Sequence, residues 1–140
     1  MAVNSGRVLV GAIAGGVVWS AWSACINLVA LEKRYAEARQ TGLFLKHSRY
    51  PLFVVYWIVL LFVLSYIVAW LYASVGATRG AGPGTALQVG ILVGFASGFP
   101  GAFGASAWLP FSRYIPLWQM LELWVGAILA AVVAGWIYRY

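Results

Sequence analysis

The sequence contains no aspartate, one cysteine and one histidine, and these absences exclude most catalytic and metal sites. Without aspartate, no Ser-His-Asp triad can form. Cys25, His47 and three glutamates supply neither a cysteine cluster nor a second histidine for a metal site. Cys25 has no partner for an intrachain disulfide. The sequence therefore predicts a protein that is not an enzyme and holds no metal or cofactor.

Charge is also scarce. Charged residues make up 9% of the 140 residues and hydrophobic residues 64%, whereas soluble domains are about 25% charged. A soluble fold of this size could not bury so much apolar surface, so lipid must be its solvent. The net charge of +6 comes from basic residues at the ends of apolar runs. That placement favours anionic lipid headgroups as partners and excludes nucleic acid.

Four apolar runs are long enough to cross a bilayer, which takes about 20 residues. They predict an all-α membrane protein, a four-transmembrane-helix bundle that forms one domain over residues 1–140. The expected spans are 8–31, 52–75, 85–108 and 116–138. Residues 32–50 form an amphipathic connector, helical over 32–47, in which Gly42 is a candidate helix breaker.

The loop charges predict an orientation. With four spans, both termini and the middle loop share one side of the membrane, and that side carries Arg7, Arg79 and Arg139. The opposite side carries six basic residues, namely Lys33, Arg34, Arg39, Lys46, Arg49 and Arg113. Because cytoplasmic loops are the more basic ones, we expect the connector to be cytoplasmic and both termini to be periplasmic.

Two short segments resemble each other. Residues 48–52 read SRYPL and residues 112–117 read SRYIPL, and both precede an aromatic-rich span. The chain can therefore be divided into two helix pairs, 1–75 and 80–140, which would form a parallel repeat about the membrane normal. Alternatively, any basic, aromatic and proline-containing helix start at a membrane interface looks alike.

Small residues predict where helices approach closely. In lipid, glycine lets two backbones come together and gain van der Waals contact. Such positions recur in the first and third spans at Gly11, Gly15, Gly90, Gly94 and Gly98. Their partner can lie in the same chain or in another chain. Pro100 should kink the third span, because it removes a backbone donor.

Polar side chains inside the spans are the main candidates for function. Glu122 is the only acid within a span, and Gln119 lies one turn before it. Ser20, Ser23 and Asn27 share one side of the first span. Glu122 can exchange protons or bind a cation; alternatively, a protonated or Arg113-paired Glu122 ties helices together.

Two further sites follow from aromatic residues and from the single histidine. Tyr66 and Trp70 are four residues apart and can form one wall of a groove for a lipid, a quinone or a pigment. Alternatively, the Trp and Tyr residues near span ends are interfacial anchors. His47 lies among cations in the connector, where it is a candidate axial ligand of a haem or pigment.

The order of several motifs resembles a group of small, uncharacterised bacterial four-helix membrane proteins that share a domain of unknown function. The resembling elements cover most of the chain: Trp19, Asn27, Lys33-Arg34-Tyr35, Arg49-Tyr50-Pro51, Trp70-Leu71-Tyr72-Ala73, Gly82-Pro83-Gly84-Thr85-Ala86-Leu87, Gly90, Gly94, Glu122 and Trp124. The resemblance implies a four-span bundle in the bacterial inner membrane. It implies no activity.

Together these patterns favour a non-enzymatic accessory or scaffold subunit that packs against larger membrane partners. Glycine faces and aromatic surfaces without a catalytic constellation motivate this expectation. The alternatives are a small oligomeric transporter or channel that uses Glu122, and a bundle that binds a lipid, quinone or pigment. The expected partners are membrane lipids, with other membrane subunits or further copies of the chain.

Overall fold

A computed structural model describes residues 2–138, and every regular element in that range is a helix. The first long helix runs from Ser5 to Gln40 in three parts, α1 (Ser5–Cys25), a π-helical segment η1 (Ile26–Leu31) and α2 (Glu32–Gln40). It is followed by α3 (Phe53–Arg79), α4 (Pro83–Trp108) and α5 (Tyr114–Ile137). The predicted all-helical class, with four helices long and apolar enough to cross a membrane, is confirmed. Arg139, which entered the charge count, lies outside the described residues.

Local sequence explains where the helices begin and end. The Asn4 side chain accepts a hydrogen bond from the Arg7 amide and caps α1. Helix α2 ends at Gln40, so the helix expected over 32–47 is too long. The chain leaves the helix because Gly42 adopts a φ of 78°, a left-handed conformation that glycine tolerates best.

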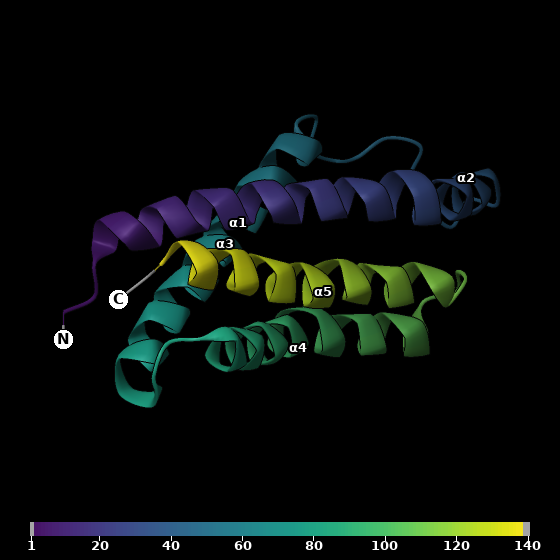
Figure 1. Cartoon of the computed structure of the whole chain (residues 1–140). Helices are drawn as coiled ribbons and strands as arrows, with labels where there is room; N and C mark the ends of the chain where they lie inside the picture. Colours follow the sequence, from purple (N-terminus) through teal and green to yellow (C-terminus); the bar gives the residue numbers. More distant parts are fainter. Residues whose placement is uncertain (1, 139–140) are drawn as a thin grey trace.

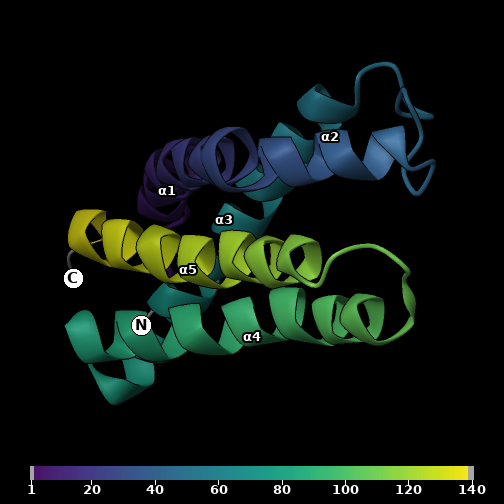
Figure 2. The same ribbon diagram turned by 90° about the vertical axis from the view of Figure 1, so that its right-hand side faces the viewer.

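Helix α5 lies at the centre of the bundle. Helices α4 and α5 run side by side along their length, α1 lies on the other side of α5, and α3 crosses obliquely (Figures 1 and 2). The two ends of the described range lie at one end of the bundle, where the Asn4 amide donates to the Tyr138 hydroxyl at 3.0 Å. Because α3 crosses its neighbours while α4 does not, the two helix pairs are arranged differently, and an internal repeat stays a prediction.

The glycines of α1 and α4 lie against α5 in the same chain. A Cβ atom on Gly90 would lie 2.6 Å from the Ile128 Cα, and one on Gly94 would lie 2.8 Å from the Trp124 Cα. On the other side of α5, a Cβ on Gly11 would lie 3.3 Å from the Ala134 Cα. These glycine faces therefore serve contacts within the bundle.

Tryptophan and small residues interlock in the middle of the bundle. Trp19 of α1 is fully buried, and its indole ring occupies the space that a side chain on Gly126 would need. Around it lie Leu61 and Val68 of α3 and three alanines of α5, Ala127, Ala130 and Ala131. This core holds α1, α3 and α5 together. Most of the outward-facing side chains on α3 are also large and apolar.

We predict that Gly90→Ala destabilises the bundle by about 1–3 kcal/mol, the usual cost of overpacking. The new methyl group would meet the α5 backbone, which cannot move without displacing the helix. Gly104→Ala on the same helix is the matched control, because a Cβ there meets no atom within 4 Å. Thermal unfolding in a mild detergent measures both. Equal midpoints for the two variants would contradict the close packing of α4 on α5.

Candidate functional site

Three donors converge on the side chain of Glu122. This residue lies in α5 and is only 2% exposed. Its Oε1 atom accepts hydrogen bonds from the Ser23 hydroxyl, from the Asn27 amide at 3.1 Å and from the Trp57 indole at 2.9 Å. Within residues 2–138, no donor bonds to Oε2. Side chains from α1, η1 and α3 thus meet one carboxyl group of α5.

A second layer of hydrogen bonds orients these donors. The Tyr35 hydroxyl donates to Asn27 Oδ1 at 3.3 Å, and the Gln119 amide donates to the Tyr35 oxygen at 3.0 Å. The Asn27 amide also donates to the Ser23 carbonyl at 2.9 Å. Gln119 therefore acts on Glu122 through Tyr35 and Asn27 and not by direct contact.

Two tryptophans fix α1 against this part of α5. The Trp19 indole donates to the Glu122 backbone carbonyl, and the Trp22 indole donates to the Leu121 carbonyl, both at 3.1 Å. Because sliding of α1 along α5 would leave these indole N–H groups without an acceptor, the contact resists that movement. The position of Ser23 relative to Glu122 is set by this pair of bonds.

The π-helical segment η1 brings Tyr35 to Asn27. On a regular α-helix, residues eight positions apart are offset by about 80° around the axis. A π turn takes one more residue per turn, so η1 between the two residues reduces that offset. The Tyr35 ring consequently lies over Asn27 although the α-helical pattern does not place the two on one face.

Glu122 borders a cavity of about 750 Å³ between the four long helices. Its polar groups come mainly from α1, η1, α2 and α5, and its apolar walls from α3 and α4. Figure 1 shows how this arises, since the first half of α3 diverges from the second half of α4. The lining residues are Ser20, Ser23, Ala24, Asn27, Leu28, Tyr35, Arg39, Phe53, Val54, Trp57, Ile58, Leu61, Ser97, Gly98, Gly101, Ala102, Ala105, Gln119, Glu122 and Leu123.

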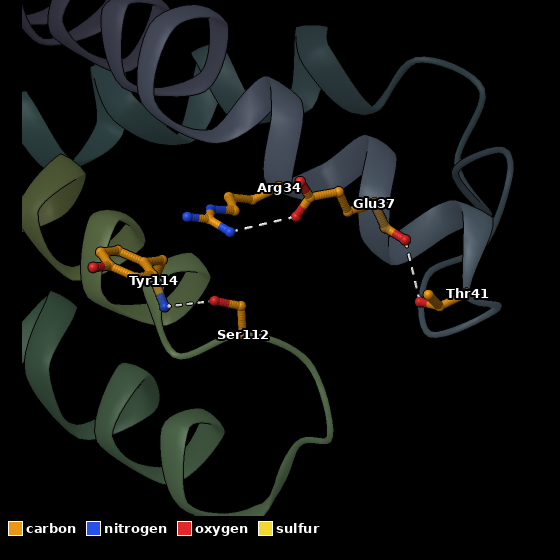
Figure 3. Close-up of polar contacts among 5 residues, drawn as sticks. All are labelled: Arg34, Glu37, Thr41, Ser112 and Tyr114. Atoms are coloured by element: carbon orange, nitrogen blue, oxygen red, sulfur yellow. Dashed lines mark hydrogen bonds and ion pairs between the residues drawn. The ribbon is translucent and has the colours of Figure 1, made fainter.

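Glu122 has no cationic partner in the described part of the chain. The pairing with Arg113 that the sequence suggested does not occur. Figure 3 shows the ion pair that is formed instead on the neighbouring helix, between Arg34 and Glu37 at 3.4 Å. The Arg34 guanidinium also lies 4.9 Å from the centre of the Tyr114 ring. The Arg34–Tyr114 contact ties α2 to the start of α5, and neither contact neutralises Glu122.

The remaining predicted site residues lie elsewhere. Tyr66 and Trp70 are 44% and 48% exposed on α3 and do not line the cavity, so the groove expected there is separate from the cavity and stays a prediction. His47 is exposed in the connector, away from the cavity. Ser20 does line the cavity, and within the described residues its buried hydroxyl has no hydrogen-bond partner. No group of three His, Cys, Asp or Glu side chains that could hold a metal occurs in residues 2–138.

Sequence reasoning missed Trp57 and Tyr35 as site residues. Trp57 resembles an interfacial anchor near the start of its span, and only the oblique crossing of α3 brings it to Glu122. Tyr35 follows the first span and needs η1 to reach Asn27. Finding these donors from sequence would require knowing how each helix is rotated about its axis, because that rotation decides which side chains face Glu122. Hydropathy does not give this rotation.

Comparisons with known proteins return nothing. No protein-family model, no curated protein and no solved structure matches this chain. The resemblance to small bacterial four-helix membrane proteins therefore stays a prediction, and function must be inferred from the geometry of the site.

We predict that Trp57→Phe lowers the free energy of unfolding by about 1 kcal/mol, because it removes one donor from a buried acceptor. Trp70→Phe on the same helix is the matched control, since the Trp70 ring is exposed and lies outside the cavity. The midpoint of detergent-solubilised thermal unfolding distinguishes the two. If both variants unfold at the same temperature as the wild type, the Trp57–Glu122 bond contributes nothing.

Proposed function

We propose that the protein is inserted in the bacterial inner membrane and binds a membrane-soluble small molecule in the cavity beside Glu122. The observation that carries this proposal is the placement of one buried carboxyl group, held by three donors, at the polar wall of a cavity whose opposite walls are apolar. The molecule would be amphiphilic, with its polar group at Glu122 and its apolar part along α3 and α4. No catalytic step is part of the proposal.

The size and lining of the cavity support a ligand. Small-molecule sites typically enclose about 300–1,000 Å³, with apolar walls and a few convergent polar groups. The cavity has a volume in this range, with apolar walls on α3 and α4 and polar groups that converge near Glu122. Phe53, Ile58 and Leu61 form apolar wall on one side, and Gly101 and Ala102 on the other.

Loop charge supports the orientation. Six of the nine basic residues lie between the first span and α3 or between α4 and α5. These segments are at the end of the bundle where Tyr35 and Arg39 line the cavity. We place this end on the cytoplasmic side and both termini on the periplasmic side. The cavity then lies in the cytoplasmic half of the bundle, within reach of molecules dissolved in the inner leaflet.

A transporter is the second candidate, and one observation favours it. The cavity is lined by the π-helical segment η1 and by the part of α4 that contains Pro100. π turns are frequent at functional sites, and proline removes a backbone hydrogen bond, so both are places where a helix can bend. The accessory-subunit role expected from the sequence stays a prediction. The glycine faces that motivated it are covered by α5.

We predict that Gly101→Phe abolishes binding of the native small molecule. A Cβ on Gly101 meets no atom within 4 Å, and Gly101 lines the cavity, so the ring would fill the cavity without displacing a helix. The measurement is mass analysis of small molecules that co-purify with the protein from its native membrane in a mild detergent.

Gly104→Phe is the matched control for this experiment. Gly104 is on the same helix and equally open, but it does not line the cavity. We expect wild type and Gly104→Phe to retain the same compound and Gly101→Phe to lose it. Identical small-molecule content in all three proteins, or none above the detergent blank in the wild type, would overturn the proposal.

A further inference from the structure

We infer that the ligand of the cavity is a lipophilic organic cation whose positive charge pairs with the Glu122 carboxylate. This inference rests on the proposed function and adds the charge and the chemical class of the ligand. It is carried by the contacts of Glu122, by the absence of an ion pair to it within the described residues, and by the aromatic and apolar walls.

Three donors on one oxygen of Glu122 stabilise a negative charge there. Asn27 and Trp57 reach Oε1 through N–H groups, which can only donate. Ser23 could in principle donate or accept. However, its oxygen accepts from the Trp57 indole at 3.3 Å and from the Asn27 amide at 3.5 Å, which occupy both of its lone pairs, so its own proton points to Glu122. A protonated Glu122 would carry its proton on Oε2, where the described residues make no hydrogen bond, and would lose the charge that the three donors on Oε1 stabilise.

The negative charge is compensated only by neutral dipoles. Uncharged donors lower the cost of burying a carboxylate, but they do not remove it, and an unpaired buried charge remains costly. Of the charged and titratable groups that line the cavity, Tyr35 and Arg39 come from α2 and Glu122 from α5, and α1, η1, α3 and α4 contribute none. Arg39 is exposed and forms no ion pair with Glu122. A ligand cation would complete the site.

The walls favour an organic cation over a metal ion. Phe53 and Trp57 lie together, with ring centroids 6.0 Å apart, and both line the cavity. Aromatic faces attract cations, and more strongly where water is excluded. Metal ions prefer several oxygen, nitrogen or sulfur ligands, and Glu122 is the only carboxylate in the cavity. Ile58 and Leu61 complete a surface suited to hydrocarbon groups around a single positive charge.

The experiment compares three probes of similar size with the full-length protein in lipid nanodiscs. Tetraphenylphosphonium carries a positive charge, tetraphenylborate is its negative counterpart, and triphenylphosphine oxide is neutral. Binding is measured by equilibrium dialysis, and binding to empty nanodiscs is subtracted. We expect tetraphenylphosphonium to bind at least about tenfold more tightly than either other probe, as an ion pair in a site of low dielectric would produce.

Two variants then test whether the preference for the cationic probe depends on Glu122. Glu122→Gln keeps the shape of the side chain and should remove the preference for the cation. Glu37→Gln is the matched control, because it makes the same charge change on an exposed residue outside the cavity, and it should keep the preference. The comparison among probes in the wild type needs no variant, so the inference stays testable even if Glu122→Gln fails to fold.

The outcomes separate this inference from the proposed function. If the neutral probe binds as tightly as the cation and Gly101→Phe blocks both, the cavity binds ligands but the inference of a cation is wrong. If tetraphenylphosphonium binding survives Gly101→Phe unchanged, the cavity is not the site, and the proposed function fails together with the inference. Retention of cation preference in a folded Glu122→Gln protein would also overturn the inference.

Discussion

The site depends on one constraint, the burial of the Glu122 carboxyl group in the interior of an apolar bundle. Because such a group is costly without partners, donors must come to it, and they come from three elements: Ser23 of α1, Asn27 of η1 and Trp57 of α3. Helix α5 carries the acid and lies between α1 and α4. The polar cluster therefore fixes the rotation of α1 and α3 about their axes, which apolar packing alone specifies only weakly.

The cavity follows from two kinds of helix packing in one chain. Glycines at 90, 94 and 98 let α4 lie directly on α5, whereas α3 crosses the bundle obliquely (Figure 2). Because α4 follows α5, the first half of α3 diverges from the second half of α4. The space between α3 and α4 is lined by residues 53–61 and 97–105. Small residues at Gly98, Gly101 and Ala102 keep that space open. Close packing on one side of α4 thus creates room on the other.

Hydropathy predicts the four helices to within a few residues, because the thickness of a bilayer sets the length of an apolar run. Glu122 and the stripe of Ser20, Ser23 and Asn27 are also visible in the sequence, since a single acid in a span is conspicuous. Trp57 and Tyr35 are not, because their positions depend on a crossing angle and on a π turn. The groove predicted at Tyr66 and Trp70 stays a prediction, because aromatic content does not tell which face of α3 turns inward, and both side chains lie outside the cavity.

The charge state of Glu122 is the centre of this account, and infrared difference spectroscopy measures it most directly. The spectrum of Glu122→Gln is subtracted from that of the wild type, both free of added ligand and reconstituted in lipid at neutral pH. Three donors on Oε1 predict that the difference contains the paired stretching bands of an ionised carboxylate. A difference that contains instead the single carbonyl band of a protonated carboxylic acid would contradict the account, because a neutral Glu122 has no charge for a cation to pair with.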